Sequence, residues 1–89
     1  MIEIEKGYYI QKSTRKNKKY DIYIKHNDKY KYVVSFGDSR YSQFFDSTPL
    51  KLYSKLNHND KERRRLYYLR HGLENNKLSA RYWSNKYLW

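Results

Sequence analysis

The chain has 89 residues, a length that suits one domain and leaves little room for two. It contains no cysteine, which excludes disulfides and thiolate zinc sites, and no apolar run of the roughly 20 residues that a membrane span needs. Twenty lysines and arginines against nine acidic residues give a net charge of +11, and such a surface attracts polyanions. Twelve tyrosines argue against disorder, which goes with few aromatic residues. The first residues, MIEIEKGYY, do not form a signal peptide, because they carry two acids and no apolar segment.

Residues 8–36 predict a meander of three antiparallel strands. The segments YYIQKS (8–13), YDIYIKH (20–26) and KYKYVVSF (29–36) are β-prone, and the last two alternate along their length. In the third segment Tyr30, Tyr32, Val34 and Phe36 are expected on one face. One face of this sheet is apolar and needs a cover.

Residues 37–46 predict a loop, and three short helices are expected over about 48–56, 60–73 and 78–87. Pro49 after a Ser-Thr pair is typical of a helix start. Asn59 and Glu62 form a capping-box pattern with Asn59 as the N-cap residue, and Gly72 is a stop signal. The expected fold is a single small basic α+β domain over residues 1–89, a three-stranded antiparallel β-meander followed by two or three short helices packed on one face.

The segment NHNDKERRRLYYLRHGLEN (57–75) contains the middle helix, and a helical projection divides its side chains. Leu66, Leu69 and Leu73 form an apolar stripe that we expect in the core. A neighbouring face is mixed and polar, with Asp60, Arg63, Tyr67, Arg70, His71 and Glu74. Two interpretations of this face remain open. Its arginines could bind phosphates, or they could pair with carboxylates and lock the C-terminal tail onto the helix.

The remaining basic residues are candidates for external anions. RKNKK (15–19) lies in a connection between strands, and Arg64 and Arg65 point away from the leucine stripe. This run could contact a phosphate backbone or an acidic partner, serve in nuclear import, or be a solvated hairpin tip. The candidate nucleic-acid-binding residues are Arg15, Lys16, Lys18, Lys19, Arg64 and Arg65.

The C-terminal half resembles a family of small uncharacterised proteins from giant, nucleocytoplasmic large DNA viruses. The resemblance rests on the pattern H-x-D-x-x-R-x-x-x-Y-x-x-R-H-x-x-E-N from His58 to Asn75, followed by S-A-x-x-W-S-x-x-Y-L-W from Ser79 to Trp89. It implies a viral origin, and hence a location in the virion or viral factory, in the host cytoplasm or nucleus. The matched positions suggest one helix-tail constellation, which is either an internal structural contact or an interface with another molecule. Its members are His58, Asp60, Arg63, Tyr67, Arg70, His71, Glu74, Trp83 and Trp89.

No catalytic centre, metal site or cofactor is expected. The three histidines have no HExxH or i, i+4 spacing, and there is no glycine-rich phosphate loop. GYYI and YVVSFG resemble the paired strands of GIY-YIG nucleases, but the spacing does not match. We therefore expect a non-enzymatic protein that binds DNA or RNA non-specifically through the phosphate backbone, in genome packaging or the viral factory. The alternative is a structural or adaptor protein that binds a viral protein through its polar helix face and aromatic tail, and a homodimer stays open.

Overall fold

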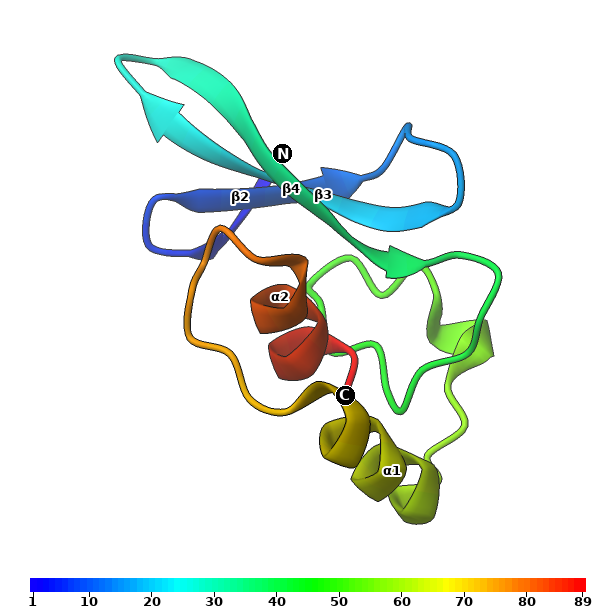
Figure 1. Cartoon of the computed structure of the whole chain (residues 1–89). Coiled ribbons are helices and arrows are strands. Elements are labelled where there is room, and N and C mark those ends of the chain that lie inside the picture. Colours follow the sequence, from blue (N-terminus) through cyan, green and yellow to red (C-terminus); the bar gives the residue numbers. More distant parts are fainter.

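A four-stranded antiparallel sheet forms one layer of the computed structural model, which describes all 89 residues (Figure 1). The strands are β1 (Ile2–Glu5), β2 (Tyr8–Lys12), β3 (Lys18–His26) and β4 (Lys29–Asp38), and they lie side by side in chain order. The α+β class is confirmed, but the prediction of three strands was wrong. The missed strand, β1, is only four residues long, and the chain turns from it into β2 at Gly7, whose φ of +81° favours glycine.

The helical part is smaller than predicted. It contains one 3₁₀ turn, η1 (Ser54–Leu56), and two helices, α1 (Lys61–His71) and α2 (Ala80–Tyr87). The predicted helix over 48–56 was wrong except for η1. Asp60, not Asn59, is the N-cap of α1, because its carboxylate accepts two backbone N–H bonds while Asn59 has a left-handed φ of +55°. Gly72 ends α1 as predicted, with a φ of +67°. Neither helix has the length and apolarity of a membrane span.

Both helices and the long connection before them lie on one side of the sheet (Figure 1). Of the two helices, α2 packs against the sheet and covers its core. The fully buried apolar residues come from β2, β3, β4, α2 and the C-terminal tail: Ile10, Tyr20, Ile22, Phe36, Trp83 and Leu88. The helix α1 lies outside α2, and the hydroxyls of Tyr67 and Tyr68 donate to Asn85 of α2. The predicted packing of all helices on the sheet was therefore wrong for α1.

The leucines of α1 are not part of the core. The exposed fractions are 42% for Leu66, 70% for Leu69 and 85% for Leu73, so the predicted core stripe was wrong. The buried residue of α1 is Tyr67, on the face that the projection had classed as mixed and polar. The reason is that α1 packs on the C-terminal tail and α2, which present aromatic and polar partners, and not on an apolar sheet face.

The connection between β4 and α1 is held by buried polar side chains. The Asp46 carboxylate accepts hydrogen bonds from the hydroxyls of Tyr20 (2.5 Å) and Thr48 (2.6 Å) and from the backbone N–H of Tyr53 (3.1 Å). The buried Gln43 amide donates to the backbone carbonyl of Tyr53 at 2.8 Å. These bonds satisfy backbone groups that regular secondary structure would otherwise pair, so this segment needs no helix.

Candidate functional site

An open cleft of about 420 Å³ lies between one end of the sheet, α1 and the C-terminal tail. Its wall includes Lys18 of β3, Asp38 of β4, Tyr67, Arg70 and His71 of α1, and Trp89. The close approach of tail and sheet depends on Gly37, since a Cβ atom there would come within 2.9 Å of the Leu88 side chain. Two other hollows have a similar size, one of about 450 Å³ lined by Leu73, Glu74 and Asn75, and one of about 390 Å³ at the β3–β4 hairpin, lined by His26, Asn27, Lys29, Tyr30 and Lys31. Neither joins segments that are distant in the chain.

The cleft joins two parts of the sequence that were considered separately. Lys18 comes from the basic run at 15–19, whereas Arg70 and His71 come from the polar face of α1. None of the five ion pairs of the chain includes Lys18, Arg63 or Arg70. The interpretation in which Arg63 and Arg70 pair with carboxylates is therefore not what the structure shows. Arg63 instead donates to the Ser42 hydroxyl at 3.0 Å, beside the cleft.

The only acidic side chain that lines the cleft, Asp38, is already paired. Both oxygens of Asp38 accept bonds from the Arg40 guanidinium, at 3.0 and 2.8 Å. These bonds hold the pKa of Asp38 at about 2, so it stays charged and paired at neutral pH. The cleft therefore carries a local excess of positive charge from Lys18 and Arg70.

The wall of the cleft beside these cations is aromatic. The rings of Tyr67 and Trp89 are stacked, with centroids 4.3 Å apart and planes 5° from parallel. His71 lies on Tyr67 with centroids 4.5 Å apart, and His58 packs against Trp89 at 5.2 Å. Burial raises the pKa of Tyr67 to about 12, so its hydroxyl remains a hydrogen-bond donor to Asn85.

Two of the other predicted anion-binding residues, Lys19 and Arg65, are engaged in contacts within the chain. Lys19 is buried, and its ammonium donates to the Tyr41 carbonyl at 2.9 Å and to the Gln43 side chain, so it does not reach solvent. Burial lowers the pKa of Lys19 to about 8 against the attraction of nearby carboxylates. Arg65 is exposed but pairs with Glu62.

The rest of these candidates are exposed cations outside the cleft. Lys16 lies in the turn between β2 and β3, and the Arg15 guanidinium lies over the Tyr32 ring. Arg64 lies over the Phe44 ring at 4.8 Å, beside a smaller hollow that Trp89 also lines. Cations therefore border Trp89 on two sides.

The remaining members of the predicted helix-tail constellation do not gather at the cleft. Trp83 is fully buried against the sheet, where its indole N–H donates to the Lys77 carbonyl at 2.8 Å. Asp60 caps α1, and Glu74 lies 4.0 Å from Arg81. The constellation is therefore partly an aromatic stack around Trp89 and partly a set of separate structural contacts.

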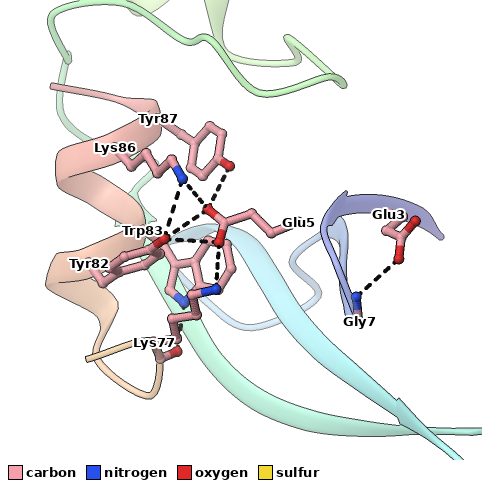
Figure 2. A network of polar contacts seen from close by, with 8 residues as sticks. All are labelled: Glu3, Glu5, Gly7, Lys77, Tyr82, Trp83, Lys86 and Tyr87. Carbon is pink, nitrogen blue, oxygen red and sulfur yellow. Dashed lines mark hydrogen bonds and ion pairs between the residues drawn. The ribbon is translucent and has the colours of Figure 1, made fainter. Parts of the chain in front are cut away.

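The contact that fixes the tail was missed by sequence reasoning. Figure 2 shows the Glu5 carboxylate of β1 surrounded by side chains from α2 and the segment before it. The hydroxyls of Tyr82 (2.9 Å) and Tyr87 (2.8 Å) donate to it, and the ammonium groups of Lys77 (3.1 Å) and Lys86 (2.8 Å) pair with it. We call these five residues the Glu5 clasp.

Four donors to one carboxylate determine its charge state. Burial of Glu5, whose side chain is 11% exposed, would raise its pKa, but the bonds from Lys86, Tyr87, Tyr82 and Lys77 outweigh burial and lower it to about 2. The partners lie 72 to 82 residues away along the chain, so no local pattern could have identified Glu5 as their acceptor. With all four donors engaged, the Glu5 clasp is a structural element and not a free site.

Comparison of the chain with models of protein families, with curated proteins and with solved structures finds no match. The site must therefore be interpreted from its own geometry. No group of three or more His, Asp or Glu side chains comes together as metal ligands would.

Proposed function

We propose that this protein binds nucleic acid through the phosphate backbone, and that the cleft between the sheet, α1 and the tail is the main binding site. The observation that supports this proposal is that Lys18 and Arg70 both line an open cleft whose only acidic side chain, Asp38, is already paired with Arg40. Unpaired cations beside a cleft attract phosphates, and a net charge of +11 speeds the encounter.

The aromatic wall shapes the cleft beside these cations. Tyr67 is buried against Trp89 and His71, so these rings are used internally and the cleft meets nucleic acid through its cations. Backbone contacts carry no sequence information, so we expect little discrimination between sequences. Arg63 and Arg64, both exposed and outside any ion pair, extend the positive surface along α1.

The alternative, an adaptor that binds protein through its aromatic tail, has less support. Trp83 and Leu88 are buried in the domain, and Trp89 is stacked on Tyr67, so the tail is used internally. A viral origin, a place in the virion or viral factory and the lack of an enzymatic activity stay predictions.

The test is a salt series on the purified full chain with a labelled DNA duplex, read by fluorescence anisotropy. Lys18, Arg63, Arg64 and Arg70 are four accessible unpaired cations, so the slope of log K against log salt should lie near −3 to −4, at about −0.9 per phosphate. Duplexes of unrelated sequence should bind alike. No detectable binding at about 50 mM salt would refute the proposal.

Two double variants test whether the cleft is the binding site. Lys18→Gln with Arg70→Gln should weaken binding at every sequence and reduce the slope by about 2, because each removes one phosphate contact. Lys6→Gln with Lys55→Gln removes the same charge from two exposed lysines outside the cleft and is the matched control. Equal losses of affinity in the two double variants would show that only net charge matters and that the cleft is not the binding site.

A further inference from the structure

The sheet has a second face that no helix covers. Both helices and the long connection lie on the opposite side (Figure 1). Cross-strand partners share a face of a sheet, and Tyr9 of β2, Tyr23 of β3 and Tyr32 of β4 are partners in one row. Tyr30 is paired with Lys25 in a further row of the same face. We call Tyr9, Tyr23, Tyr30 and Tyr32 the tyrosine face.

A register shift creates this face. Between Ile22 and Tyr23 the pairing of β3 with β4 slips, and Val33 is left without a partner. A slip of one residue moves the following side chains to the other face, so Tyr30 and Tyr32 leave the face of Val34. The prediction that Tyr30, Tyr32, Val34 and Phe36 share one face was wrong for this reason.

The rings are held in place and still accessible. Tyr9 packs edge-on with Tyr30 at 5.1 Å between centroids, and Tyr23 does so with Tyr32 at 5.9 Å. Tyr30 and Tyr32 remain 43% and 39% exposed. These are large aromatic surfaces on a face that no helix protects.

Hydrogen bonds beneath the rings fix their orientation. The Tyr32 hydroxyl bonds to the Ser35 hydroxyl at 2.8 Å, and Ser35 donates to the buried Asp21 carboxylate at 2.5 Å. The Gln11 side chain donates to the Tyr23 hydroxyl at 3.2 Å. The tyrosine face is therefore preorganised, which lowers the entropy cost of binding a flat ligand.

Positive charge flanks the tyrosine face. The Arg15 guanidinium lies 4.0 Å from the centroid of Tyr32, and the Lys25 ammonium lies 5.7 Å from that of Tyr30. The two carboxylates of this face accept hydrogen bonds from neutral donors, Asp21 from Ser35 and Glu3 from the backbone N–H of Gly7, and of the two only Glu3 is exposed. Aromatic rings beside unpaired cations complement a chain that offers both flat rings and phosphates.

We propose that the tyrosine face binds single-stranded nucleic acid by stacking unpaired bases on Tyr30 and on the Arg15 guanidinium that already lies over Tyr32, with Lys25 holding the phosphates. A duplex keeps its bases stacked on one another, so these stacking surfaces discriminate in favour of single strands. The row from β2 to β4 spans roughly 10 Å, room for about two or three bases. The inference rests on the proposed function in that the partner is nucleic acid, but it uses a different surface.

A second copy of the chain is a less suitable occupant. Two copies meeting through this face would bring two sets of Arg15 and Lys25 together, four cations against the one exposed carboxylate, Glu3, that each copy has on this face. Burial of uncompensated like charges opposes such a contact. A polyanion is attracted by the same charges.

The test compares an oligothymidylate of about 12 nucleotides with a duplex of the same length, by fluorescence anisotropy on the full chain. Tyr30→Ala with Tyr32→Ala should weaken binding of the single strand by about tenfold or more and change duplex binding much less. Tyr30→Leu with Tyr32→Leu keeps apolar cover on the sheet and should lose the same preference, which separates stacking from misfolding. Leu52→Ala with Leu78→Ala is the matched double control, because both side chains are exposed, at 51% and 68%, and lie outside this face and outside the cleft.

Three outcomes would overturn the inference. If single strand and duplex bind alike and only the Lys18→Gln/Arg70→Gln variant weakens them, the proposed function stands and the tyrosine face has no role. If the wild-type chain sediments as a dimer that Tyr30→Ala with Tyr32→Ala dissociates, the face is a protein interface. If neither nucleic acid binds the wild-type chain, the proposed function fails together with the inference.

Discussion

Replacing Glu5 by glutamine tests whether the Glu5 clasp holds the first strand to the last helix. Glutamine keeps the length of the side chain and removes its charge. The ammonium groups of Lys77 and Lys86 then lose the carboxylate that lies 3.1 and 2.8 Å away. The change therefore removes two ion pairs at a site where the acidic side chain is only 11% exposed.

The expected loss of stability follows from the pKa of Glu5. A fall from the ordinary 4.5 to about 2 corresponds to about 3 kcal/mol of stability at neutral pH. Because the folded-state pKa lies below the unfolded one, this stability is fully present above about pH 4.5 and is lost as the pH falls toward about 2. For a domain of this size, about 3 kcal/mol lowers the melting temperature by on the order of 15 °C.

The assay is thermal unfolding by circular dichroism from about pH 7 to pH 2.5, for the wild-type chain and Glu5→Gln in parallel. The difference between the two is the quantity of interest, because burial also lowers the pKa of His58 and reduces the stability of both proteins at acid pH. The difference should be large at pH 7 and shrink below about pH 4.5. Glu62→Gln, which breaks an exposed pair with Arg65, is the control and should change the melting temperature little. A difference that is small at pH 7, or that does not depend on pH, would refute this account of the clasp.

Two further predictions concern stability. Trp83→Ala should cost about 3–5 kcal/mol and leave the chain largely unfolded by circular dichroism, whereas Trp89→Ala should cost less because Trp89 lies at the domain surface. A folded Trp83→Ala protein with an unchanged melting temperature would contradict its place in the core. Leu69→Gln should change the free energy of unfolding by no more than about 0.5 kcal/mol, since Leu69 is 70% exposed. A loss of several kcal/mol in the free energy of unfolding in urea would show that Leu69 belongs to the core after all.

Local signals predicted the parts of the fold that local chemistry determines. Asn27 and Asp28 both adopt positive φ, 50° and 64°, at the hairpin turn where the sequence placed it. Gly72 ends α1 for the same reason. The strands β2, β3 and β4 were found from β-prone composition and alternation, with bounds that differ by a few residues.

Long-range partners explain what could not be predicted. The apolar stripe of α1 was assigned to the core from spacing alone, but spacing does not say whether a sheet lies beneath the helix. The unpaired Val33 reverses the faces of Tyr30 and Tyr32 without a glycine or proline to mark it. Lys19 and Arg64 were equivalent in the sequence, and only the fold buries one against Gln43 and leaves the other exposed.

The sequence predicted the positive charge of the candidate site but not which residues the fold brings together there. The basic character of the chain and the roles of Lys18 and Arg70 as cations could be inferred from composition and pattern. Their meeting at one cleft depends on the tail packing against both the sheet, which Gly37 permits, and Tyr67 of α1. The tyrosine face depends on a bulge, so its residues were noted as β-prone and not as a surface.

The members of the Glu5 clasp are synthesised far apart in time, so the clasp can form only late during synthesis. The β2–β3 and β3–β4 hairpins join neighbouring segments and can form as soon as they leave the ribosome. Glu5 finds Tyr82 and Tyr87 only after 77 and 82 further residues. At about 5–20 residues per second, the nascent sheet, complete at Asp38, waits roughly 2–10 s with its apolar face uncovered until α2 ends at Tyr87. A chain that stalls before α2 therefore exposes Ile10, Ile22 and Phe36, the surface that chaperones recognise.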